Sequence, residues 1–199
     1  IMLIISAFAY NDYGLSWDET AQRETGRINY EYVFSDNQYL LEYYDRDYGV
    51  AIELPLYVIE KVFNIQDSRS VFLMRHIASH LFFLVGAYFC FLLIDFLYKN
   101  KFLAIVGFLL IVLHPLLYAH SFFNSKDLPF FSMFLICFYF IARAFENKSF
   151  LNFLVVGFLL GILINIRIMG VLLLAAVIFF LLLDLLVTKK YLQHVKLIM

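Results

Sequence analysis

Charged residues and prolines are scarce in this chain of 199 residues. Only 16% of the residues are charged and 3 are proline, whereas 63% are hydrophobic. Soluble globular domains carry about 25% charged residues, so the composition excludes both an ordinary soluble enzyme and a disordered chain. The formal net charge of -1 offers nothing to attract nucleic acid, and we expect no such partner. The two cysteines, Cys90 and Cys137, lie inside apolar runs, which excludes a disulfide-rich secreted domain.

The long apolar runs predict an all-α, polytopic transmembrane helix bundle of about six spans, the first of them truncated. A helix needs about 20 residues to cross the hydrocarbon core. A single helix over residues 150–187 would be about 57 Å long, so two spans are the better interpretation there. For the first run a signal-peptide remnant stays open, because Ala7-Phe8-Ala9 fits a cleavage pattern. The predicted spans are residues 1–10, 71–98, 102–118, 128–145, 150–164 and 168–187.

The charges are distributed unevenly along the chain. Residues 11–70 hold 12 Asp and Glu against 5 Lys and Arg, whereas the rest of the chain holds 4 against 10. This pattern is typical of a large external loop on a membrane bundle, so we expect residues 11–70 to form the first extracytoplasmic loop of a single membrane domain, 1–199. Residues 20–34 are predicted to be helical with Thr20 as the cap. The tyrosine-rich loop is expected to lie along the membrane surface; a separately folded soluble unit is the alternative.

Basic residues at the span ends predict the orientation. Three clusters mark cytoplasmic junctions by the positive-inside rule. Residues 11–70, 119–127 and 165–167 are therefore expected on the outside of an integral, multi-pass protein of the bacterial plasma membrane. The chain starts without Met and stops within an apolar run, so we expect the N-terminal fragment of a longer protein. The three basic clusters are Lys99 and Lys101, Arg143 and Lys148, and Lys189 and Lys190.

The first candidate site is the carboxylate pair Asp18 and Glu19, directly after the first span. A carboxylate at the membrane interface has a raised proton affinity and can act as a general base. The alternative is an ordinary acidic helix start. Two further residues, Arg75 and His76, are interpreted as interfacial anchors, and Asp184 has no evident partner.

Two more clusters fall on the same predicted face. His120, Lys126 and Asp127 lie in the turn before the fourth span, where Asp127 could simply cap the helix. Histidines 114 and 120 give only a weak zinc signal, and we assign no metal ligand. Arg167 interrupts an apolar stretch, as a binding residue or as a side chain that snorkels to headgroups. Acids and cations together at a lipid interface suit the transfer of a group from a lipid phosphate: the carboxylate deprotonates an acceptor and the cations stabilise the leaving phosphate.

Three motifs resemble those of the GT-C glycosyltransferases, in particular the family 39-like branch of protein O-mannosyltransferases and lipid-A aminoarabinose transferases. They are Trp17-Asp18-Glu19, Asn124-Ser125-Lys126-Asp127-Leu128-Pro129 and the stretch Gly157…Gly161…Arg167. The resemblance implies inverting transfer of a sugar from a polyprenyl-phosphate donor to a protein, lipid or glycan acceptor.

By position in these motifs, Asp18 would be the base, Glu19 would support it, and Asp127 would be the second acidic residue. Lys126, Arg167 and His120 are expected to bind substrate, with membrane lipids as surroundings and a divalent metal left open as a cofactor. A polytopic transporter and a non-catalytic membrane scaffold are the alternative functions. A transporter is expected to show polar groups at the bilayer midplane and repeated halves, which this sequence does not.

Overall fold

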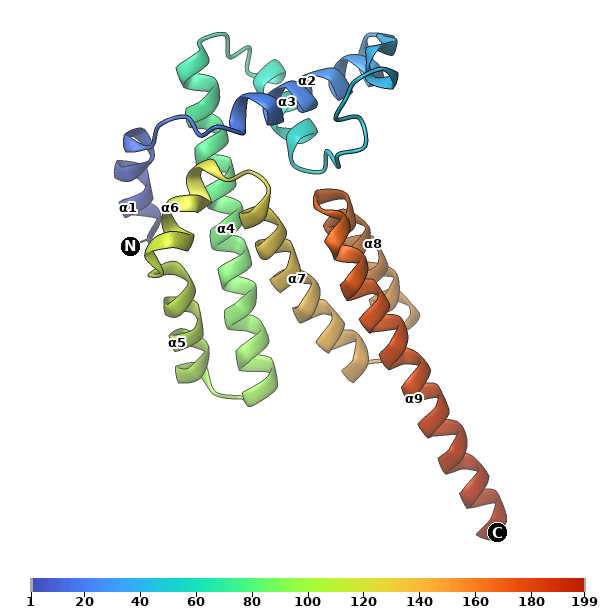
Figure 1. The fold of residues 1–199 in the computed structure, drawn as a ribbon. Coiled ribbons are helices and arrows are strands. Elements are labelled where there is room, and N and C mark those ends of the chain that lie inside the picture. The colour runs from blue at the N-terminus through green and yellow to red at the C-terminus, as the bar shows by residue number, and fades with distance from the viewer. Residues whose placement is uncertain (1, 199) are drawn as a thin grey trace.

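The protein is an all-α bundle with two short helices lying across one end (Figure 1). The computed structural model describes the backbone of residues 2–198 and the side chains of residues 5–187, and no strand occurs within that backbone range. The helices are α1 Met2–Ala9, η1 Tyr10–Asp12, α2 Glu19–Phe34, η2 Gln38–Leu41, α3 Glu53–Val62, α4 Ser68–Tyr98, α5 Lys101–Val112, α6 Pro115–Phe123, α7 Asp127–Glu146, α8 Phe150–Ile166, η3 Ile168–Gly170 and α9 Val171–Ile198.

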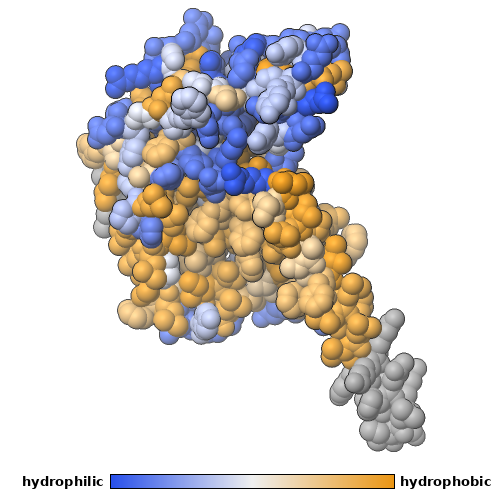
Figure 2. Space-filling view, viewed as in Figure 1, coloured by the Kyte–Doolittle hydropathy of each residue, from blue (hydrophilic) through white to orange (hydrophobic). Residues whose placement is uncertain are grey.

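Three helical stretches within the described residues are long and apolar enough to cross a membrane. They are α4, α7 and the stretch Ile168–Val187, and they confirm three of the predicted spans. The hydropathic surface agrees, because orange apolar side chains cover the bundle and blue polar ones gather over α2 and α3 (Figure 2). The protein is therefore an integral membrane protein. We call the end of the bundle that carries α2 and α3 the loop end.

The predicted third span is broken. Helices α5 and α6 meet at an angle of 60°. His114 lies at the break, where its side chain accepts a hydrogen bond from the backbone N–H of Leu117, and Pro115 opens α6. Proline has no N–H for the helix interior, so the sequence His-Pro starts a new helix. The third span predicted over residues 102–118 is therefore made of two helices, which together are long and apolar enough to cross a membrane.

The break between α8 and α9 confirms the prediction of two helices over residues 150–187. Arg167 has an extended backbone, with φ -149° and ψ 134°, and ends α8. The opposite end of the bundle is closed by a tight turn, in which Lys99 is left-handed with φ 51° and Asn100 caps α5. Ile1, where the first predicted span begins, lies outside the described residues. The side chains of Lys189 and Lys190, the third predicted basic cluster, also lie outside them.

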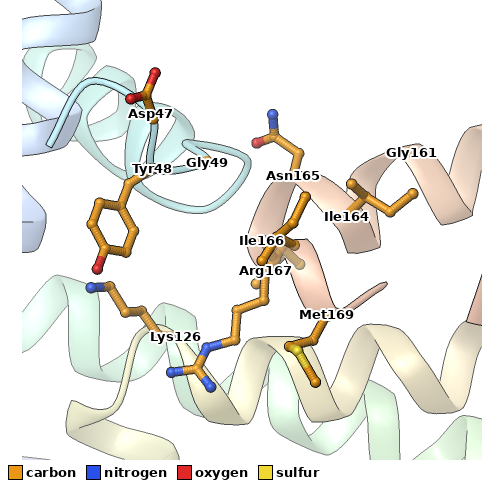
Figure 3. Close-up of a pocket in the computed structure, with 11 residues that line it drawn as sticks. Asp47, Tyr48, Gly49, Lys126, Gly161, Ile164, Asn165, Ile166, Arg167 and Met169 are labelled. Carbon is orange, nitrogen blue, oxygen red and sulfur yellow. The ribbon is translucent and has the colours of Figure 1, made fainter. Parts of the chain in front are cut away.

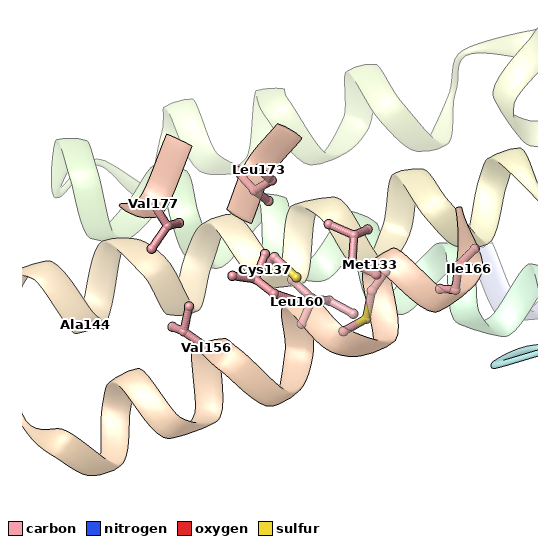
Figure 4. Packing of buried hydrophobic residues seen from close by; sticks show 10 residues of the cluster. Met133, Cys137, Ala144, Val156, Leu160, Ile166, Leu173 and Val177 are labelled. Atoms are coloured by element: carbon pink, nitrogen blue, oxygen red, sulfur yellow. The ribbon is translucent and has the colours of Figure 1, made fainter. Parts of the chain in front are cut away.

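The buried core lies mainly between α7, α8 and α9. Met133 and Cys137 of α7 face Leu160 of α8, and Leu173 of α9 closes the cluster (Figure 4). A second cluster joins α4, α5 and α7 around Phe83, which is completely buried.

Helices α4 and α7 approach closely at Gly86. A Cβ added to Gly86 would lie 2.5 Å from the Cα of Ser132. Small residues let membrane helices pack tightly, since their association depends on van der Waals contact. This contact fixes α7 against α4 below the candidate site.

Buried polar contacts attach the loop helices to α4. Glu19, at the start of α2, lies 2.8 Å from Nε2 of His76, and Glu53 of α3 is paired with Arg75. All four side chains are at most 3% exposed. The prediction that Arg75 and His76 are interfacial anchors is wrong, because the loop helices cover them and supply their carboxylate partners. Gly26 leaves the room that α3 needs, since a Cβ there would lie 2.6 Å from the Glu53 carbonyl oxygen.

Polar contacts also join the remaining elements. His80 of α4 lies 2.6 Å from the hydroxyl of Ser6 and 2.7 Å from that of Ser121, which links α1 and α6 to α4. Asp184, which the sequence left without a partner, accepts a hydrogen bond of 2.6 Å from Lys148. The sequence could not indicate that pair because 36 residues separate its members.

Candidate active site

A polar cavity of about 220 Å³ opens at the loop end between the start of α2 and the turn between α6 and α7. It brings together five of the six predicted site residues: Asp18, His120, Lys126, Asp127 and Arg167. These residues come from three distant parts of the chain. We call this the polar cavity; its other lining residues are Ser16, Trp17, Gln22, Phe123, Asn124 and Ser125.

The sixth predicted residue, Glu19, does not line the polar cavity. Its side chain is 3% exposed and points into the bundle, where one oxygen lies 2.8 Å from His76 and the other accepts the backbone N–H of Ser16 at 2.7 Å. The hydroxyl of Ser16 in turn donates to the carbonyl of Phe123 at 3.3 Å. Glu19 therefore holds the chain on both sides of Asp18, which leaves the exposed Asp18 carboxylate facing the cavity.

The same contacts explain the start of α2. Helix α2 begins at Glu19. The Glu19 carboxylate accepts the backbone N–H of Ser16, three residues earlier, a contact similar to the one in a capping box. The prediction that Thr20 caps the helix is therefore wrong. No signal in the sequence distinguished Glu19 from Asp18 as the buried member of the pair, since His76 lies 57 positions away.

The turn before α7 presents Lys126 and Asp127 to the cavity. The side-chain oxygen of Asn124 accepts the backbone N–H groups of Lys126, at 3.2 Å, and Asp127, at 2.7 Å. Asn124 thus does the capping that the sequence analysis attributed to Asp127, and that alternative is wrong. The Asp127 carboxylate accepts a hydrogen bond from the Asn124 amide through Oδ2, at 3.1 Å, and its Oδ1 lies 2.7 Å from Nη2 of Arg167.

A second, wider cavity of about 690 Å³ adjoins the polar one (Figure 3). Four apolar side chains around the α8–α9 break, Ile164, Ile166, Ile168 and Met169, form much of its wall. Lys126 and Arg167 line both cavities and so stand where the two meet. We call this the wide cavity; its remaining lining residues are Asp47, Tyr48, Gly49, Gly161 and Asn165.

Three residues of the wide cavity were not recognised from the sequence. The Lys126 ammonium lies 4.4 Å from the ring centre of Tyr48, a cation–π distance, and the loop at Gly49 approaches Asn165 (Figure 3). Tyr48 is one of many tyrosines in the loop, and Asn165 stands next to the more conspicuous Arg167. Nothing in the sequence indicates their contacts, because Tyr48 lies 78 positions from Lys126 and Asn165 lies 115 positions from Val50.

Other side chains near the site are structural. Tyr13 stacks on Phe122 with ring centres 4.5 Å apart, and its burial raises the pKa of its hydroxyl. His114 is used as a helix cap, as described above. Among the residues that the structure describes, no group of three or more His, Cys, Asp or Glu side chains is arranged to hold a metal ion.

The membrane bundle gathers carboxylates and cations at one end, beside the wide cavity. The comparison with protein families identifies the class of protein as a glycosyltransferase of the GT-C type. The family model described as dolichyl-phosphate-mannose-protein mannosyltransferase matches residues 54–199, and the chain belongs to that family. The match includes Lys126, Asp127 and Arg167 and starts after Asp18. Comparisons with curated proteins and with solved structures give no significant match.

Proposed function

We propose that the protein transfers a sugar from a polyprenyl-phosphate donor to an acceptor hydroxyl on the extracytoplasmic face, with inversion at the anomeric carbon. The observation that supports this most directly is the position of Lys126 and Arg167, which line both cavities. A lipid phosphate has an apolar chain on one side of its charge and a sugar on the other. The apolar wall of the wide cavity at the α8–α9 break suits the chain, the two cations suit the phosphate, and the polar cavity suits the sugar.

Asp18 is the proposed general base. It is exposed at the polar cavity, and the buried contacts of Glu19 hold it there. In the reaction, the acceptor oxygen gives its proton to Asp18 and forms a new bond to the anomeric carbon. The bond from that carbon to the phosphate oxygen breaks, and the phosphate keeps the electron pair. One carboxylate opposite the leaving group is sufficient for inversion, because the polyprenyl phosphate monoester leaves readily as an anion.

Arg167 and Lys126 stabilise the charge of the leaving phosphate. Arg167 is paired with Asp127, and both side chains are about half exposed, at 45% and 51%. An arriving phosphate can take hydrogen bonds from the guanidinium in place of this carboxylate, since Arg binds phosphate and carboxylate with the same geometry. Asp127 then keeps its hydrogen bond from Asn124, and its Oδ1 faces the polar cavity without the guanidinium. His120 lies there too, tilted against Phe123 with ring centres 4.9 Å apart, and is proposed to contact the acceptor or the sugar.

The orientation follows from the basic residues at the opposite end of the bundle. Lys99 and Lys101 lie in the α4–α5 turn, and Arg143 and Lys148 flank the turn between α7 and α8. Positive residues favour the cytoplasmic side, so the loop end and both cavities are proposed to face outside the cell membrane, with the plasma membrane of a bacterium as the location. A protein, lipid or glycan is the proposed acceptor class.

The test uses the complete protein in membrane vesicles with a panel of radiolabelled polyprenyl-phosphate sugars. We expect transfer or hydrolysis by the unaltered protein and a loss of about 10²-fold or more in Asp18→Asn. Asp36→Asn is the matched control, because Asp36 is exposed on the same loop and its φ of 53° suits Asn equally well. Activity that survives in Asp18→Asn at equal expression removes Asp18 as the base. No transfer from any donor overturns the proposed donor class.

A further inference from the structure

A segment of the loop and the end of α8 are fastened to each other beside the wide cavity. The side-chain oxygen of Asn165 accepts two backbone N–H groups, from Val50 at 2.9 Å and from Ala51 at 2.7 Å. Gly49 lies against the backbone of the same residue, and a Cβ at position 49 would overlap the Asn165 carbonyl oxygen. The two backbones thus meet where no side chain fits between them (Figure 3). We call this contact the loop latch.

The loop latch lies between the parts that bind the phosphate in the proposed function. On the loop side it is preceded by Tyr48, whose ring covers the Lys126 ammonium at 4.4 Å. On the helix side it is followed, two residues on, by Arg167, which lines both cavities. The latch therefore determines how far the loop wall of the wide cavity stands from its α8–α9 wall.

We propose that Asn165 is a positioning residue that fixes the loop wall of the donor cavity, so that Tyr48 and Arg167 meet the donor preorganised; this inference rests on the proposed function. Without the two hydrogen bonds, donor binding itself has to order the segment at Gly49. The entropy lost in that ordering reduces the affinity for the donor. Asp18 is held by separate contacts of Glu19 with His76 and Ser16. Loss of the latch should therefore raise KM for the donor and leave kcat almost unchanged.

The first test measures steady-state kinetics of the complete protein in vesicles. Asn165→Ala is expected to raise KM for the polyprenyl-phosphate sugar about tenfold, the loss expected for two hydrogen bonds, with kcat within about twofold. Gly49→Ala breaks the same contact, so the double variant should be no worse than the more impaired single variant. Asn152→Ala is the matched control. Asn152 lies at the other end of α8, and its side-chain amide donates a hydrogen bond to the carbonyl of Asn147, far from the latch.

The second test does not depend on activity. Trypsin cleavage after Arg46, an exposed residue next to the latch, should be faster in Asn165→Ala than in the unaltered protein. Asn165→Asp keeps the acceptor oxygen and should restore the protection. Polyprenyl phosphate without a sugar should slow the cleavage in the unaltered protein and do so less in Asn165→Ala, because its binding orders the same segment.

The kinetic outcomes test the positioning role of Asn165, and the cleavage outcomes test the loop latch itself. An unchanged KM in Asn165→Ala, a fall in kcat as large as the rise in KM, or additive effects of Gly49→Ala and Asn165→Ala would each overturn the positioning role. Equal cleavage of all variants would overturn the latch itself. A third outcome is faster cleavage in the latch variants, with no protection by polyprenyl phosphate and no sugar transfer. In that case the attachment of the loop stands, but the proposed donor is wrong. The role of Asn165 in donor binding is then refuted as well.

Discussion

The buried pair of Arg75 and Glu53 permits the sharpest prediction about stability. The two side chains are only 2% and 3% exposed, and the pair joins α3 to α4 under the loop end. Replacement of Arg75 by Met leaves the Glu53 carboxylate buried without its cation. Loss of one partner of a buried ion pair costs about 3–5 kcal/mol, which we expect for Arg75→Met.

The double replacement should behave differently. Even in the intact pair, Oε1 of Glu53 and Nη1 of Arg75 have no hydrogen-bond partner among the described residues. Each such buried atom costs about 1–3 kcal/mol, so the attraction within the pair is largely offset. Replacing both residues by Met removes these atoms and fills a similar volume. We expect the double variant to lie within about 1 kcal/mol of the unaltered protein.

The assay follows thermal unfolding in detergent through the reaction of Cys137 with a maleimide dye, in a Cys90→Ser background. Cys137 is 1% exposed, so it reacts only when the bundle opens. On the scale of soluble domains of this length, the single variant should lower Tm by about 10 °C. Arg69→Met, at an exposed position on the same helix, is the control. The reasoning would be refuted if Arg75→Met lowered Tm by less than about 2 °C. It would also be refuted if the decrease in Tm of the double variant equalled the sum of the decreases caused by the two single replacements.

Two further predictions concern packing and pH. Gly86→Val should cost about 1–3 kcal/mol or more in the same unfolding assay, because its side chain would collide with Ser132 of α7. The hydrogen bond from Arg27 holds the pKa of Glu24 below its usual value of 4.5, so the pair stabilises α2 above that pH and ceases to do so as the pH falls through the lowered pKa. Both partners are more than a third exposed, so Glu24→Gln should cost only about 0.3–0.5 kcal/mol at pH 7 and nothing once the pH lies well below the lowered pKa of Glu24.

Each of these two predictions has an outcome that would contradict it. A Gly86→Val protein as stable as the unaltered protein would mean that α4 and α7 do not meet at Ser132. A Glu24→Gln deficit that persists unchanged at low pH would show that the loss is not electrostatic.

Much of the site could be predicted from the sequence because its residue types are costly in apolar surroundings. Arg167 stood out as a lone charge between apolar runs, and Asp127 and Lys126 stood out in a short turn between two spans. Once the sides of the membrane were assigned, these residues and Asp18 had to fall at one boundary, and the polar cavity contains them all. The partners of Arg75 and His76 could not be predicted in this way, since a covering loop changes an interfacial residue into a buried one.

The sequence by itself determined the class of fold, the boundaries of three spans and the break at Arg167, because hydrophobic length and the positions of charges act locally along the chain. It did not distinguish Asp18, which faces the cavity, from Glu19, which is buried against His76. It also did not indicate the loop latch at Asn165. These features depend on how α2, α3 and α8 pack together, and such contacts between distant residues are decided only by the tertiary structure.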